Sequence, residues 1–143
     1  MGMNDPFRNL PGTLQCDLSE ERLLKLQKAM FQNQIELSKS GVDADELPNG
    51  YGEFGLTLSN PIPCQFIMGG RLYLDRLRVS DGTKIRYLRI GSFFSEVTPH
   101  PIDGYLLSHP NGTTLATIYI SAYQKRNSSK SPKGFYLAST PFS

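Results

Sequence analysis

The sequence predicts an α+β fold in which an N-terminal amphipathic helix packs on a twisted antiparallel β-sheet built from sequential hairpins. A capped helical segment precedes two turn dipeptides, Asp81-Gly82 and Asn111-Gly112, each flanked by strand-forming runs. The chain shows no alternation of strands and helices, no internal repeat and no heptad pattern. Its 143 residues suffice for one domain with its own core. We therefore expect a single domain over 1–143, divided into an irregular arm over 1–16, a helix over 17–41 and a β-rich part over 42–143.

The helix is expected to run from about residue 18 to residue 40. Asp17 or Ser19 can cap its first turn, where negative charge is favoured, and Gly41 can supply a left-handed stop. The apolar side chains cover about half of the helix surface, which is typical of a helix that packs on a sheet. These side chains are Leu23, Leu24, Leu26, Met30, Phe31, Ile35 and Leu37. Polar residues within the same stripe either lie at its rim or bond to backbone on a neighbouring element; they are Gln27, Gln34 and Ser38.

The first predicted hairpin pairs Arg71–Val79 with Lys84–Phe94 around Asp81-Gly82, a dipeptide that suits a type I′ turn. This register would place Tyr73 opposite Ile90. Neither face is cleanly apolar, so we expect arginine stems to lie across apolar neighbours at a partly exposed sheet.

The second predicted hairpin pairs Ile102–Ser108 with Thr114–Tyr123 around Asn111-Gly112. Tyr105 would face Ile118, which gives this hairpin the better core face.

Charge is segregated along the chain although the net charge is only +2. Residues 42–53 contain four carboxylates and no base, whereas residues 71–89 hold six bases against two acids. A second basic stretch, residues 124–134, contains Lys125, Arg126, Lys130 and Lys133. The pattern is compatible with a charged contact surface and equally with solvated charge on exposed strands.

The sequence offers no catalytic or metal-binding constellation, so we expect neither an enzyme nor a cofactor. His100 and Asp103 lie close together in a proline-rich segment typical of a solvated turn, and no local feature activates Cys64 as a nucleophile beside His109. Cys16 and Cys64 could form a disulfide, but the cytosolic base rate favours two reduced thiols. Without a Cys or His cluster, no structural metal site is expected.

Composition and patterning also bear on the surroundings of the protein. No uncharged stretch is suited to a membrane-spanning helix, and the N-terminus lacks the basic start and apolar run of a secretion signal. We expect a cytoplasmic protein that does not enter a membrane; its oligomeric state cannot be predicted.

An ordered series of short motifs covers residues 50–137 and resembles that of small bacterial proteins from polymorphic-toxin loci, which are similar to immunity proteins. The motifs are Gly50-Tyr51-Gly52-Glu53-Phe54-Gly55, Asn60-Pro61-Ile62-Pro63, Tyr73-Leu74-x-x-Leu77, Arg89-x-Gly91-Ser92 and Pro132-Lys133-Gly134-Phe135. The resemblance implies a stoichiometric function: binding and occluding a cognate toxin domain. Because inhibitors of nucleases are often acidic, either residues 43–53 form a local acidic patch or the target is not a strongly basic nuclease.

Two alternative functions remain open. Arginines alternate with aromatic residues over the predicted strands, as in RNA-binding sheets, but the β–α–β–β–α–β order is missing and nucleic acid is the less favoured partner. A small hydrolase is less favoured still.

Two surfaces are candidates for partner binding: the acidic stretch over residues 43–55, and the first hairpin together with the basic loop over 125–133. Aromatic and arginine side chains dominate interface energies, so we favour the hairpin face. The predicted contact residues are Arg76, Arg78, Arg86, Tyr87 and Arg89.

Overall fold

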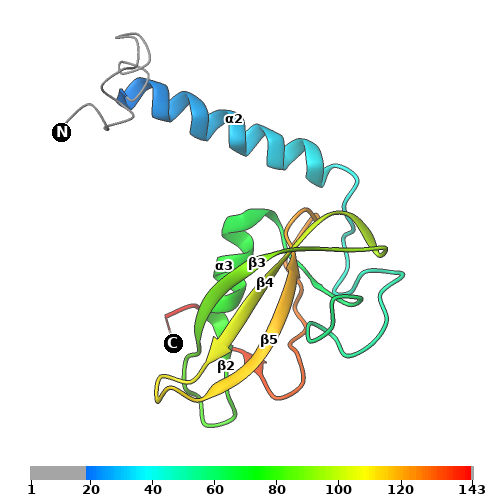
Figure 1. The fold of residues 1–143 in the computed structure, drawn as a ribbon, viewed down its shortest axis with the longest axis vertical. Helices are drawn as coiled ribbons and strands as arrows, with labels where there is room; N and C mark the ends of the chain where they lie inside the picture. Colours follow the sequence, from blue (N-terminus) through cyan, green and yellow to red (C-terminus); the bar gives the residue numbers. More distant parts are fainter. Residues whose placement is uncertain (1–18, 143) are drawn as a thin grey trace, which may run out of the picture. The chain divides into compact units, whose positions relative to one another are not determined.

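The computed structural model describes residues 19–142 and confirms the α+β class (Figure 1). Contacts divide the chain into two compact units, Met1–Glu36 and Leu37–Ser143. The prediction of one domain over the whole chain stays a prediction, and the predicted arm over 1–16 lies outside the described residues. The elements in chain order are α2 (Glu20–Ser38), β1 (Ile62–Pro63), α3 (Phe66–Arg76), β2 (Leu77–Arg78), β3 (Arg86–Ser95), β4 (Thr98–Ser108), β5 (Thr114–Ser121) and β6 (Tyr136–Leu137).

Helix α2 forms where the sequence predicts it. The hydroxyl of Ser19 accepts a hydrogen bond from Arg22 N at 3.3 Å, which confirms Ser19 as a cap, and acidic residues occupy the first turn. The apolar stripe of the helix is mostly exposed, and its packing on the sheet stays a prediction. The expected role of Gly41 is wrong, because Gly41 does not adopt a positive φ. A Cβ there would lie 2.5 Å from the carbonyl oxygen of Tyr123, so this glycine permits close backbone contact instead.

The main sheet has four strands in the order β1-β5-β4-β3 (Figure 1). Its central hairpin, β4 with β5, is the predicted second hairpin, and the predicted pairing of Tyr105 with Ile118 is confirmed. The two-residue strand β1 runs parallel to β5, with Ile62 opposite Ile120. Strand β3 pairs with β4 and forms one edge of the sheet.

The first predicted hairpin is wrong, because residues 66–76 form helix α3 and not a strand. The turn at Asp81-Gly82 does form: Gly82 has a φ of 88° and donates a hydrogen bond to Val79 O. The strands on either side of it find other partners, however. Strand β2 pairs with β6, and β3 pairs with β4, so Tyr73 does not face Ile90.

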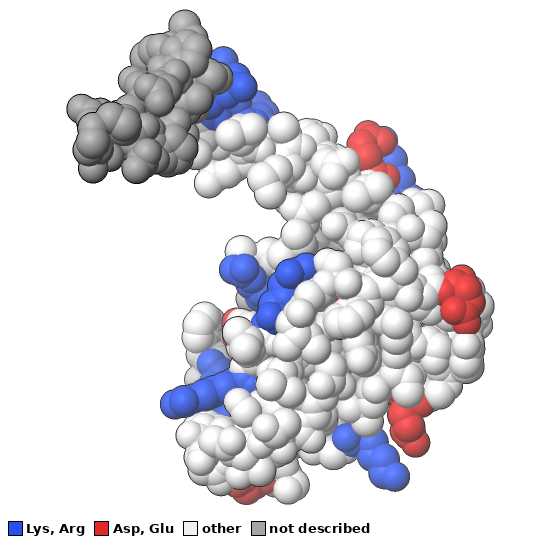
Figure 2. Space-filling view, in the orientation of Figure 1, with Lys and Arg blue, Asp and Glu red and all other residues white. Residues whose placement is uncertain are grey.

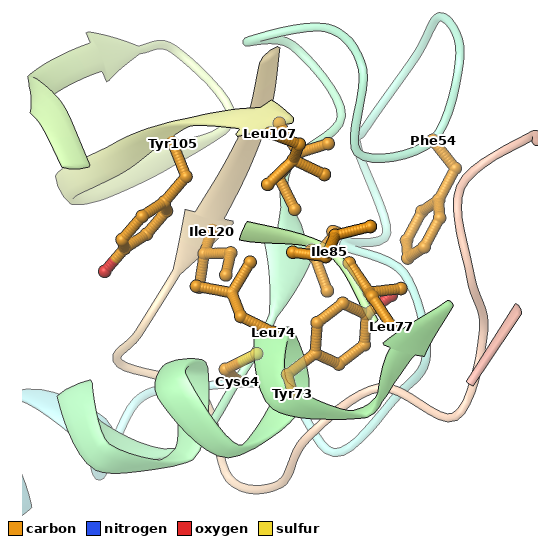
Figure 3. Close-up of a cluster of buried hydrophobic side chains, with 11 residues drawn as sticks. Phe54, Cys64, Tyr73, Leu74, Leu77, Ile85, Tyr105, Leu107 and Ile120 are labelled. Atoms are coloured by element: carbon orange, nitrogen blue, oxygen red, sulfur yellow. The ribbon is translucent and has the colours of Figure 1, made fainter. Parts of the chain in front are cut away.

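Helix α3 supplies one wall of the core of residues 37–142. In Figure 3, Leu74 lies beside Ile120 and the Tyr73 ring lies beside Leu77, and all four side chains are buried. The hydroxyl of Tyr73 donates to the carbonyl oxygen of Lys130 at 2.5 Å, which ties the helix to the loop after β5. The helix therefore packs on the sheet in the place where the sequence predicted a further strand.

Candidate protein-binding surface

The structure separates the five predicted contact residues, and one of them cannot reach a partner. The side chain of Arg78 is only 2% exposed, and its Nη1 donates to the carbonyl oxygens of Asp75 at 2.7 Å and Leu77 at 3.0 Å. A buried guanidinium bonded to the end of α3 is a structural group. The prediction of Arg78 as a contact residue is therefore wrong.

Arg76 and Tyr87 hold α3 in place and are only partly exposed. Arg76 Nε donates to the carbonyl oxygen of Ala138 at 2.7 Å, and the Tyr87 hydroxyl donates to Asp75 Oδ1 at 3.1 Å. The Tyr87 ring packs edge-on against Tyr105 with centroids 6.0 Å apart. Burial, followed by the bond to Asp75, raises the pKa of Tyr87. Both side chains brace the helix against the neighbouring strands.

Arg86 and Arg89 remain exposed on the edge strand β3. Arg89 Nη2 lies 3.0 Å from Asp103 Oδ1 and 2.6 Å from the Ser92 hydroxyl, so its position is fixed by neighbours. Arg86 forms no ion pair with another residue of the described range. The same holds for Arg71 on α3, whose charge partly offsets the rise that burial causes in the pKa of Tyr87.

Large apolar side chains lie beside these arginines, and sequence reasoning missed them. Leu88 is 65% exposed, Ile90 45% and Phe94 73%. Alternation of apolar residues along β3 was the available signal, but the incorrect pairing with residues 71–79 placed Ile90 opposite Tyr73. We call Arg86, Leu88, Arg89, Ile90 and Phe94 the β3 surface.

One neighbouring aromatic ring is not exposed in the same way. Phe93 lies over Gly104 of β4, where a Cβ would come within 2.6 Å of the ring, and packs edge-on against Tyr119 with centroids 5.7 Å apart. The glycine thus provides space for an aromatic residue in the middle of the sheet. Phe93 is part of the fold, whereas Phe94 remains available to a partner.

The basic loop after β5, predicted to bind a partner together with the first hairpin, instead bonds through two of its four basic side chains to the acidic stretch of the same chain, while Lys125 and Lys133 stay exposed. Arg126 lies 2.6 Å from Asp43 and 2.8 Å from Asp45, and Lys130 lies 2.9 Å from Glu46. Backbone and hydroxyl bonds from Ser129, with the Arg126 bond, lower the pKa of Asp45 from 3.8 to about 2. We call residues 42–53 together with 125–133 the docked loops.

The distribution of charge on the molecular surface follows from these pairings. On the face drawn in Figure 2, Lys and Arg side chains gather over the part where Figure 1 places α3 and β3, and Asp and Glu lie mostly elsewhere. Within the described range, Arg71 and Arg86 form no ion pair and Arg89 pairs with Asp103, whereas Arg126 and Lys130 of the second basic stretch are paired with the acidic stretch.

A depression of about 590 Å³ opens beside the docked loops. Phe54, Lys130 and Lys133 line it together with two carboxylates, and Lys130 Nζ lies 5.0 Å from the centroid of the Phe54 ring. Two lysines and two carboxylates balance in charge there, and Lys130 is already bonded to Glu46, so the depression offers no concentrated charge of either sign.

The candidate catalytic residues are not assembled. Cys64 is a free, fully buried thiol whose pKa burial raises. His100 packs edge-on against Tyr123, while Asp103 accepts its bond from Arg89. His109 Nε2 lies 3.7 Å from Asp81 at the turns. Cys16 lies outside the described residues.

Within residues 19–142, no group of three or more His, Cys, Asp or Glu side chains could hold a metal ion. No helix in this range is long and apolar enough to cross a membrane. Comparison with protein-family models, curated proteins and solved structures found no match.

Proposed function

We propose that this chain is a non-catalytic binding protein of the cytoplasm, an immunity protein that binds a cognate bacterial toxin domain and occludes it. The observation that carries the proposal is the β3 surface, where three large apolar side chains lie exposed beside two arginines. Exposed apolar groups of this size favour a protein partner, and arginine is among the side chains that most often dominate binding energy.

The charge of the β3 surface indicates the chemistry of its partner. Arg86 and Arg71 have no carboxylate partner among the described residues, so a complementary surface on the toxin should be acidic. Residues 43–53 do not form a free acidic patch that could imitate nucleic acid, because Asp45 and Glu46 are bonded to basic side chains of the same chain. Both observations favour a toxin that is not a strongly basic nuclease.

An RNA-binding sheet is the second candidate, and exposed Phe94 beside the arginines is the observation that favours it. The tyrosines argue against it. Tyr105 is buried and Tyr87, which packs edge-on against it, is only partly exposed, so this pair does not form the open stacking surface of known RNA-binding sheets.

The test begins with the reading frame immediately upstream of the gene. We expect it to encode a large secreted protein with a variable C-terminal domain, and co-expression of the present chain should restore growth to cells that produce that domain. Binding of the two purified proteins is then measured by calorimetry, with structured RNA titrated in parallel.

Two variants locate the contact. Arg86→Glu and Leu88→Glu should each weaken toxin binding more than about tenfold, since each alters a central group of the β3 surface. Lys125→Glu is the matched control, an exposed charge reversal in the docked loops, and should bind like the wild type. Failure to restore growth, or tight salt-dependent binding of RNA in place of the toxin domain, would overturn the proposal.

A further inference from the structure

Strand β3 is an edge strand with an available side. Over Arg86–Ser95 it pairs with β4 on one side, and within the described range no strand pairs with the other. Such an edge presents unpaired backbone N–H and C=O groups, to which an extended polypeptide can add as a further strand.

The two faces of the sheet meet at this edge, and they differ in chemistry. Tyr87 lies opposite buried Leu107, so it rises on the face that carries α3, as does Arg89. Leu88 lies opposite Leu106 and projects from the other face, where Ile90 is also exposed. An added strand would therefore meet positive charge on one face and aliphatic side chains on the other.

Charge on the α3 face comes from two elements. Arg89 belongs to β3 and Arg71 to α3, and Arg71 acts electrostatically on the hydroxyls of both Tyr87 and Tyr105. Asp103 neutralises part of Arg89, but Arg71 has no carboxylate partner among residues 19–142. The complement of this arrangement is a strand with carboxylates at every second position and apolar side chains between them.

The same strand carries features that discourage indiscriminate pairing. Its register with β4 shifts between Arg89 and Gly91 and again between Phe93 and Ser95. Bulges and positive charge at a sheet edge hinder pairing with a second copy or with basic strands, so the edge selects by charge.

We propose that β3 binds an extended, alternating acidic and apolar segment of the partner protein as an additional strand of the sheet. This inference rests on the proposed function in that the segment belongs to the toxin, and it names how the toxin is held. The Leu88 and Ile90 side chains cover the apolar positions of the added strand, and Arg71 and Arg89 face its carboxylates.

The experiment uses the full chain and a short peptide in which glutamate alternates with valine, so it does not depend on any toxin. Amide hydrogen exchange of residues 86–95 should slow more than about tenfold at saturating peptide, because backbone bonds form along the edge. Two matched peptides serve as controls: one with lysine in place of glutamate, and one in which the glutamates form a block. Neither should slow exchange along β3.

A double charge reversal of the two arginines on the α3 face, Arg71→Glu with Arg89→Glu, should reverse the charge preference, so that the lysine peptide binds and the glutamate peptide does not. Ile90→Ser should weaken peptide binding without affecting the charge preference. The inference is overturned if the block peptide protects β3 equally, if protection falls outside β3, or if polyuridine RNA protects the same amides. It is also overturned if β3 is protected without peptide in a concentration-dependent way, which would indicate a second copy. A toxin that fails to bind while the alternating peptide protects β3 would reject the proposed function alone.

Discussion

Two parts of residues 37–142 carry most of their charge, and they use it in opposite ways. In the docked loops, Asp45 accepts bonds from Arg126 and Ser129, and Glu46 accepts bonds from Lys130 and Asn60. On the β3 surface, Arg86 forms no ion pair with a described residue and lies beside exposed apolar side chains. Charge that is internally bonded holds loops together, whereas charge left without a partner beside apolar groups is suited to binding.

The comparison also shows that charge segregation along a sequence is a poor guide to charge on a surface. The acidic stretch and the second basic stretch are far apart in the chain yet adjacent in the fold. Near β3, Arg71 and Arg86 keep a positive charge that forms no ion pair within the described range.

The largest effect on stability is expected at Arg78, because this arginine near β3 is buried and not exposed. Arg78→Ala removes a buried guanidinium from two carbonyl oxygens and leaves a cavity, so unfolding free energy should fall by about 3 kcal/mol. Urea unfolding followed by circular dichroism measures the change. Equal losses for Arg78→Ala and Arg86→Ala would remove the distinction between buried and exposed arginines near β3.

Asp45→Asn in the docked loops should lower the free energy of unfolding by less, about 1 kcal/mol at neutral pH, because the carboxylate is partly solvated. The folded pKa of Asp45, about 2, lies below its usual 3.8. The contribution of the ionised carboxylate to folding stability is therefore present above about pH 4 and is lost as the pH falls toward 2. The wild type should lose more stability than the variant over that interval, as measured by unfolding at several pH values. Parallel pH curves would contradict the assigned role.

The Glu46–Lys130 pair should contribute less to folding stability than Asp45 does, because both side chains are nearly half exposed. A double-mutant cycle with Glu46→Gln and Lys130→Met should give a coupling energy of about 0.5 kcal/mol at low salt. Molar salt should reduce the coupling toward zero by screening. A coupling that persists in molar salt would show that the docked loops depend on packing more than on charge.

The smallest effect on stability is expected on the β3 surface. Arg86→Glu should change unfolding free energy by less than about 0.5 kcal/mol, since the side chain is exposed and unpaired within the described range. Thermal and urea unfolding of the variant check this. A large loss of stability would mean that Arg86 belongs to the fold, and the contrast between the two regions would fail.

The sequence predicted α2 and the β4–β5 hairpin correctly because their signals are local. Ser19 lies before the first helical turn, and Asn111-Gly112 lies between two alternating runs. The pairing of Tyr105 with Ile118 then follows from the length of the turn.

Helix α3 could not be predicted in the same way, because its support comes from distant residues. It contains Gly69 and Gly70, begins at Phe66 with a φ of 65°, and has no side-chain cap from Gln65. The side chain of Asn127 provides that support instead, accepting from Gln65 N at 2.8 Å and donating to the Gly69 carbonyl at 2.8 Å. A Cβ at Gly69 would come within 2.6 Å of the Asn127 oxygen, so this glycine permits the close contact between α3 and the Asn127 side chain.

The contact residues of the candidate site were predicted only in part, because exposure, like the support of α3, depends on residues that are distant in the sequence. Arg86 and Arg89 do lie exposed on a strand, but nothing local distinguishes them from Arg78, which is buried. Burial of an arginine depends on which element follows it and what that element packs against.

The docked loops have a consequence for the order in which the protein can be made. Asp43 and Asp45 leave the ribosome early, while Arg126 and Ser129 follow them by more than 80 residues. Strand β1 likewise cannot pair until β5 has been synthesised, because Ile62 pairs with Ile120. Translation therefore produces an acidic, glycine-rich segment long before the residues that hold it, and contacts of such long sequence separation form slowly. Throughout that interval the nascent chain stays accessible to proteases and chaperones, so the time needed to translate its last third sets a lower limit on when the protein can act.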